Sequence, residues 1–161
     1  MISVVQRVHS AHVVVEAQEV ARIGSGLLAL VGAVRGDSEV DVEYLAQRLA
    51  TLRVFRDERS RMNLSVRDVG GALLLVAQFT LAADTRKGRR PSFARAMNPD
   101  TAEPLLNALI ERLRKHDLEV RSGVFGAEMQ VHLVNDGPVT LLLDSRQRRR
   151  PDTPPVDNAD V

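Results

Sequence analysis

The sequence predicts an α/β protein, a sheet-rich layered single domain in which β-sheets pack with two main helices. Several segments alternate apolar and polar residues with the period of two that strands require. Two longer segments repeat leucine with the period of a helix. The chain has 161 residues, 44% of them hydrophobic and 27% charged, which suits one soluble globular domain with its own core. We expect this domain to cover residues 1–145.

The N-terminal quarter predicts strands joined by turns. "ISVVQRV" and "HVVVEA" indicate two separate strands, and "EVARIG" a third. "IGSGLLALVGA" indicates a glycine turn that leads into a buried strand. Because Gly24 and Gly26 precede a strand and do not open a helix, they are not a dinucleotide-binding fingerprint.

Two helices are expected. The first carries a buried stripe of Val42, Leu45, Leu49 and Leu52, with a capping box formed by Ser38 and Asp41. The second runs from about 101 to 116 and is capped by Asp100 or Thr101. Pro104 is tolerated in its first turn, and its stripe is Leu105, Leu109 and Leu113.

The remaining segments predict further strands and a tail. "RVF" is a short strand before a polar hairpin or loop, and "ALLLVAQFTL" is the most apolar strand. "EVRSG", "AEMQVHLVND" and "VTLLLDS" complete the sheet, with "NDGPVT" between the last two. Residues 146–161 are rich in proline and arginine and poor in apolar residues, so we expect a disordered C-terminal tail.

Composition limits the function classes. The chain has no cysteine, which excludes disulfides and thiolate chemistry. Its apolar runs are too short to span a bilayer and its N-terminus does not resemble a signal peptide, so we expect a cytoplasmic protein without membrane contact. The net charge of +1 argues against a broad DNA-binding surface. Two basic clusters, at 86–95 and 146–150, suit either limited phosphate contact or solvated arginines.

Histidine spacing predicts no metal site. His9 and His12 lie three apart in a strand-like segment, and no zinc-type spacing occurs. A Ser-His-Asp triad stays open because its members need not be close in sequence, although no Gly-x-Ser-x-Gly elbow supports one. "AQFTLAADTRKGRRPSF" fits two readings, an ordinary strand end with a loop or a ligand site with a phosphate contact.

Five blocks in this order resemble D-aminoacyl-tRNA deacylases: "QRV", "LRVF", "AQFTLAADTRKGRRPSF", "FGAEMQV" and "NDGPVT". The resemblance covers about residues 1–145. It implies the fold of that family and a homodimeric carboxylic ester hydrolase without metal or organic cofactor. The implied main substrate is D-aminoacyl-tRNA. A second implied substrate is glycyl-tRNA in which glycine has been mischarged on alanine tRNA. The implied products are a free D-amino acid and tRNA.

The resemblance also implies site residues. The Gly137–Pro138 bond would be cis, and the motif would enter the active site of the opposite subunit, where it rejects L side chains by collision. Gln78, Phe79 and Thr80 would be the catalytic-site positions. Backbone N–H groups near Phe79 and Thr80 would stabilise the oxyanion while the ribose 2′-OH positions or activates water. Thr80 as a covalent nucleophile stays an alternative.

Other positions have supporting roles by the same resemblance. Met129 would pack near the terminal adenine, with core packing as the alternative. Arg7 would support the Gly-Pro motif, with a solvated strand residue as the alternative. The loop residues Arg86, Lys87, Arg89 and Arg90 would meet acceptor-stem phosphates.

One residue departs from the family pattern. Ala77 stands where serine usually precedes the glutamine, and alanine removes no main-chain donor, so we expect a mild effect. Two further hypotheses stay open: a catalytically weak relative that binds the tRNA end, and an unrelated hydrolase with Thr80 or a serine as nucleophile.

Overall fold

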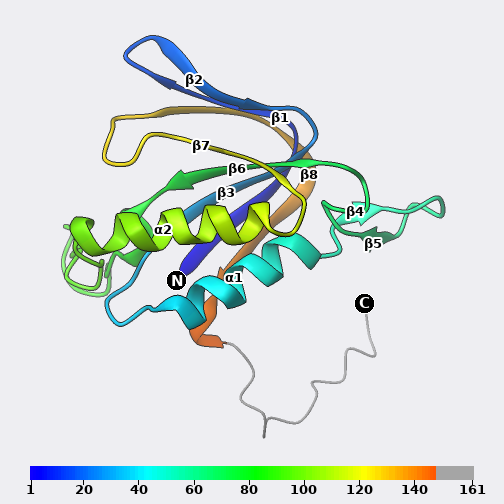
Figure 1. Ribbon diagram of the computed structural model, residues 1–161. Coiled ribbons are helices and arrows are strands. Elements are labelled where there is room, and N and C mark those ends of the chain that lie inside the picture. The colour runs from blue at the N-terminus through cyan, green and yellow to red at the C-terminus, as the bar shows by residue number, and fades with distance from the viewer. Residues whose placement is uncertain (148–161) are drawn as a thin grey trace, which may run out of the picture.

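The computed structural model describes residues 1–147 and shows one six-stranded sheet with both helices packed on one of its faces (Figure 1). The strand order is β2-β1-β3-β6-β7, and β8 pairs with β1. The main core lies between the helices and the sheet. This confirms the predicted fold class. The expected tail lies outside the described residues from 148 onward, while Arg146 and Gln147 belong to a 3₁₀ turn, η2 (Ser145–Gln147).

The first long strand, β1 (Ile2–Val15), replaces the two strands predicted for this segment. It pairs with β3 through its first half, with β2 through its second half, and with β8 along most of its other edge. The polar residues in its middle resembled a break in the sequence. The two predicted strands form one because β3 pairs with β1 up to Val8, β2 pairs with it from Ala11, and β8 runs beside both parts.

Four further strands lie in segments where strands were predicted. β2 (Gln18–Ile23) joins β1 through Glu16 and Ala17, whose φ angles of 48° and 64° form the mirror-type turn that suits a two-residue hairpin. β3 (Gly26–Gly32) is antiparallel to β1 and parallel to β6 (Ala72–Ala77). β6 in turn is parallel to β7 (Glu119–Ser122).

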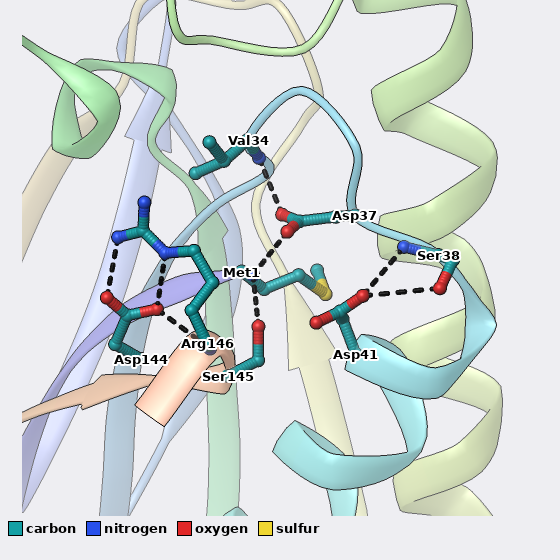
Figure 2. Close-up of polar contacts among 8 residues, drawn as sticks. All are labelled: Met1, Val34, Asp37, Ser38, Asp41, Asp144, Ser145 and Arg146. Carbon is teal, nitrogen blue, oxygen red and sulfur yellow. Dashed lines mark hydrogen bonds and ion pairs between the residues drawn. The ribbon is translucent and has the colours of Figure 1, made fainter. Parts of the chain in front are cut away.

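The first helix was also predicted correctly, and the segment after it, for which a hairpin or a loop was expected, is a hairpin. α1 (Glu39–Thr51) begins after Ser38, whose backbone N–H donates to Asp41 Oδ2 at 2.9 Å, in the predicted capping box (Figure 2). β4 (Phe55–Arg56) and β5 (Met62–Leu64) form a small separate sheet.

The second helix begins earlier than predicted. α2 (Pro99–Arg114) is capped by Asn98, whose Oδ1 accepts from the Asp100 N–H at 3.1 Å. Asp100 and Thr101 are therefore not the cap. Pro99 occupies the first turn, where its fixed φ suits a helix and its missing N–H removes no bond. No helix among residues 1–147 is long and apolar enough to cross a membrane.

The last strand, β8 (Gln130–Asp144), is continuous where two strands were predicted. "NDGPVT" is thus no hairpin turn. Gln6 pairs with Thr140 and Val8 with Asn135, so the four residues 136–139 stand opposite Arg7 alone. The extra residues form a bulge in β8.

Candidate active site

A cavity of about 660 Å³ opens at the carboxyl ends of the parallel strands β3, β6 and β7. Ligands of open α/β sheets bind at this edge, because each strand is followed there by a loop that can contribute residues. The lining includes residues from all three strand ends and from the start of α2, namely Ala33, Arg35, Gln78, Phe79, Phe93, Asn98, Pro99, Phe125 and Met129. Most of the surface is apolar, so the cavity suits a flat or hydrophobic ligand group with a few polar contacts.

The end of β6 positions the predicted catalytic segment. The strand ends at Ala77, and Gln78 leads into a 3₁₀ helix, η1 (Phe79–Ala82), where the sequence had predicted more strand. The Gln78 N–H donates to the Val31 carbonyl at 2.8 Å, which fixes the segment against β3. Phe79 and Thr80 are the first residues of η1, so their N–H groups have no partner within the helix. A short helix start therefore offers two backbone donors beside the cavity.

Gly32 allows this close approach of β3 and η1. A Cβ at this position would lie 2.7 Å from the Gln78 carbonyl oxygen and 3.2 Å from Leu81 Cβ. Such a distance to backbone forces the segment to move. The sequence analysis did not single out Gly32, although a glycine inside an apolar strand is a signal of close backbone approach.

Side-chain contacts at η1 do not form a nucleophile pair. The Gln78 Nε2 donates to Thr80 Oγ1 at 2.5 Å. An amide donor cannot take a proton from a hydroxyl, so this bond orients Thr80 without activating it. None of the residues that line the cavity is a histidine, aspartate or glutamate.

Aromatic and sulfur-containing side chains form the far walls. Phe79 packs edge-to-face against Phe93 with ring centroids 5.2 Å apart. Met129 is half-buried and lines the cavity, and it also packs against the smaller core cluster. Its Sδ lies 2.5 Å from where a Cβ on Gly123 would be, so that glycine makes room for the sulfur. The adenine contact stays a prediction.

The Gly-Pro motif lies on the exposed side of the β8 bulge. Gly137 and Pro138 are exposed and do not line the cavity of their own chain, whereas Val139 is buried in the main core. The peptide bond between Gly137 and Pro138 is cis, as the resemblance implies. Within one chain the motif and the Gln78–Thr80 segment are therefore parts of two different surfaces.

Arg7 lies in the core and contacts the residue that precedes the Gly-Pro motif. Its side chain is only 2% exposed, its Nε lies 2.7 Å from Asp136 Oδ2, and its guanidinium donates to the Val54 carbonyl. The alternative of a solvated strand residue is wrong. Beside it, Gln6 Nε2 donates to Asn135 Oδ1 at 3.2 Å. Asp136 and Gln6 were missed, because the β1–β8 register that places them here is not visible in the sequence.

The basic loop is exposed, and one of its charges is paired. Asp84 bonds to Ser92 through both backbone groups and closes the loop. Arg86 donates to the Asp84 carboxylate, and this hydrogen bond lowers the pKa of Asp84 and raises that of Arg86. Lys87, Arg89 and Arg90 form no ion pair with the described residues. A phosphate contact for these three charges stays a prediction.

Comparison with known proteins decides the family. The sequence model of the D-Tyr-tRNA(Tyr) deacylase family matches residues 4–144. The chain belongs to the D-Tyr-tRNA(Tyr) deacylase family. A D-aminoacyl-tRNA deacylase of Desulfitobacterium hafniense is 55% identical over 147 residues, which are 91% of this chain and 99% of the relative. One of Chloroflexus aurantiacus is 54% identical over 94% of each chain.

Two solved structures show the same fold. A chain described as the c-Myc DNA unwinding element binding protein superposes with a TM-score of 0.84 at 40% identity, covering 89% of this chain and 98% of its own. A probable eukaryotic D-amino acid tRNA deacylase superposes with a TM-score of 0.75 at 16% identity, over 88% and 97% of the two chains. The deacylase family membership confirms the predicted resemblance and with it the assignment of an enzyme.

Proposed function

We propose that this deacylase hydrolyses the ester of D-aminoacyl-tRNA in a site completed by a second copy of the chain. The observation that carries the proposal is the separation of its two signature segments. Gln78 and Phe79 line the cavity, with Thr80 next to them in η1, while Gly137–Pro138 stand exposed on another surface of the same chain. A second copy that presents its Gly-Pro motif to this cavity would unite them.

The exposed surface of β8 supports a homodimer. β8 pairs with β1 along one edge, and among the described strands nothing pairs with its other edge. Leu133, Val134, Leu141 and Leu142 are 36%, 55%, 38% and 66% exposed. A long apolar edge strand is a liability for a monomer and a ready surface for another chain. These side chains flank the motif on both sides, so an interface here would carry it toward the partner.

The Gly-Pro motif is suited to reading handedness by exclusion. Its backbone would face the α-carbon of the substrate, where an L side chain collides and a D side chain points away. Exclusion by backbone needs no pocket matched to one side chain, so many D-amino acids would be accepted. Glycine has no side chain to collide, which extends the proposal to glycyl-tRNA mischarged on alanine tRNA.

The start of η1 would supply the chemistry. Water attacks the ester carbonyl carbon, the carbonyl oxygen becomes an oxyanion, and the Phe79 and Thr80 N–H groups stabilise it. The bond to the ribose 3′-oxygen then breaks, that oxygen takes a proton, and the D-amino acid leaves. The ribose 2′-OH, which the substrate itself carries, would position the water. Thr80 has no base partner among the cavity residues, which disfavours a covalent intermediate.

Other parts would bind the tRNA end. The apolar cavity with Met129 and the phenylalanines suits the terminal adenine, and Lys87, Arg89 and Arg90 suit the acceptor-stem phosphates. The alternative of a weak, binding-only relative depends on Ala77, which pairs with Val31 and presents only a methyl group. Ala77→Ser tests it: a rise in turnover above about ten-fold would favour that alternative.

Release of amino acid from charged tRNA tests the proposal. The purified chain should hydrolyse D-tyrosyl-tRNA and leave L-tyrosyl-tRNA intact under the same conditions. Hydrolysis of both esters would contradict the role of the motif. Hydrolysis of neither by a folded protein that binds tRNA would support the binding-only alternative.

A further inference from the structure

The α-amino group of Met1 occupies a closed polar site at the junction of three chain segments (Figure 2). Its nitrogen lies 2.8 Å from Asp37 Oδ1, in the loop before α1, and donates to Ser145 Oγ at 2.5 Å, in the turn after β8. Met1 and Ser145 are fully buried, and the Asp37 side chain is 4% exposed. An ion pair removed from water in this way needs both partners present.

The groups around the ammonium are held by further bonds. Asp37 Oδ2 accepts from the Val34 N–H at 2.6 Å, and the Ser145 N–H donates to the Met1 carbonyl at 2.9 Å. Asp144 and Arg146 form an ion pair beside them, which is drawn in the same view (Figure 2). The hydrogen bond from Arg146 lowers the pKa of Asp144, and the ammonium adds to this. The ammonium therefore lies among charged groups of both signs.

We propose that the Met1 α-amino group is a modification-sensitive site: the native packing requires a free amine there, and acylation of it disrupts the fold locally. A formyl or acetyl group removes the positive charge and leaves a single N–H. It also adds a carbonyl in a place with no exposed surface. Asp37 would then lose the cation that lies 2.8 Å from it and stay a buried carboxylate, which is unfavourable even with Arg146 nearby.

The site is connected to the wall of the cavity. Asp37 holds the Val34 N–H, and Val34 pairs with Ala96. Ala33, Arg35 and Ala96 all line the cavity. Acylation of Met1 therefore loosens a loop that the cavity depends on. This conclusion follows from the hydrogen bonds alone and does not depend on the proposed hydrolysis of D-aminoacyl-tRNA.

Amine reactivity tests the closed site on the unaltered protein. The chain has two lysines, Lys87 and Lys115, both exposed, so its three amines are easily distinguished by peptide mass spectrometry. With an N-hydroxysuccinimide ester of acetic acid, both lysines should react in the native protein, and Met1 at least about ten-fold more slowly. In urea all three should react. Native Met1 reacting as fast as the lysines would overturn the proposal.

Stability of formylated and free chains tests the consequence. Full chains made by cell-free translation, with or without deformylase, should differ in melting temperature by roughly 10 °C, the formylated chain being lower. In an Asp37→Asn background the same comparison should give less than about 3 °C, because the carboxylate is already absent. Glu58→Gln, at an exposed carboxylate, is the control and should keep the full difference. Equal melting of the two wild-type chains, or the same decrease in the Asp37→Asn background, would contradict the proposal.

Discussion

Arg7 and Asp136 join the core of the protein to its most exposed motif. The Arg7 Nε lies 2.7 Å from Asp136 Oδ2, and Asp136 directly precedes the Gly137–Pro138 pair. The arginine is buried, whereas the aspartate is one-third exposed. The bulge of β8 is therefore anchored on its inner side and free on its outer side, as a motif that reaches into another chain requires.

Asp136→Asn should destabilise the protein and loosen the motif together. The change leaves the buried Arg7 cation without its carboxylate, which costs about 2–3 kcal/mol of unfolding free energy, the lower end for a buried pair because Asp136 is partly exposed. Urea denaturation measures this. The ratio of D- to L-tyrosyl-tRNA hydrolysis should fall as well, which a purely structural role would not produce.

His9→Ala is the matched control for this change. His9 Nε2 lies 3.7 Å from Asp136 Oδ1, and the ring is 67% exposed. Its removal should alter stability by less than about 0.5 kcal/mol. A loss equal to that of Asp136→Asn would mean that Arg7 is not the main partner.

Gly137→Ala should abolish selective hydrolysis while the chain still folds. A Cβ at 137 would meet only the Asn135 side-chain amide, at 3.2 Å, so the monomer accommodates it with a small shift. The added methyl group would instead obstruct the substrate side of the motif. We expect a rate loss of about 100-fold or more with a melting temperature within about 3 °C of wild type.

Gly26→Ala shows the opposite behaviour and serves as the comparison. A Cβ there would lie 1.9 Å from the Ala72 carbonyl oxygen, so β3 and β6 cannot keep their positions. This variant should lose stability first. If Gly137→Ala unfolded like Gly26→Ala, the motif would have a structural role in its own chain.

Thr80→Val separates the two mechanisms. If backbone N–H groups stabilise the oxyanion, removal of the hydroxyl lowers the turnover number by less than about ten-fold. A covalent nucleophile would lose at least about a thousand-fold and would leave an ester on Thr80 after acid quenching. Single-turnover hydrolysis of D-tyrosyl-tRNA measures the difference, and Thr80→Ser is the control that retains a hydroxyl.

Neutralising the loop should change tRNA affinity and its salt dependence. Arg89→Ala and Arg90→Ala each remove an unpaired exposed charge, so each should reduce the slope of log affinity against log salt by about one. Arg86→Ala should have less effect because Arg86 is already paired with Asp84. Binding of uncharged tRNA at several salt concentrations checks this. Equal slopes in all variants would place the phosphate contact elsewhere.

Much of the fold follows from local sequence patterns. The helices, the hairpins and the parallel apolar strands have periodicity and capping signals that act over a few residues. The predictions are wrong where the structure of a segment depends on pairing with a distant part of the chain. β1 and β8 are continuous because they pair with each other through polar stretches such as Gln6–Ser10, and nothing local indicates that pairing.

The site divides in the same way. Gln78, Phe79 and Thr80 are placed at a strand end that the sequence predicts, whereas the partners of Arg7 depend on a register between residues more than a hundred positions apart. Gly32 and Met1 are further cases. Gly32 matters because the Gln78 backbone lies against it, and Met1 because the Asp37 carboxylate binds its amine. Neither contact can be predicted from the residue type alone.

Mixed dimers test the central claim that one chain completes the site of the other. Gly137→Val chains, and Phe79→Pro chains that lack one oxyanion N–H at the first position of η1, should each be inactive alone; the two are unfolded together and refolded in equal amounts. About half of the dimers should then be mixed, with one intact site each, so the mixture should recover about one-quarter of wild-type D-tyrosyl-tRNA hydrolysis. No recovery, with mixed dimers demonstrated by native mass spectrometry, would contradict the shared site.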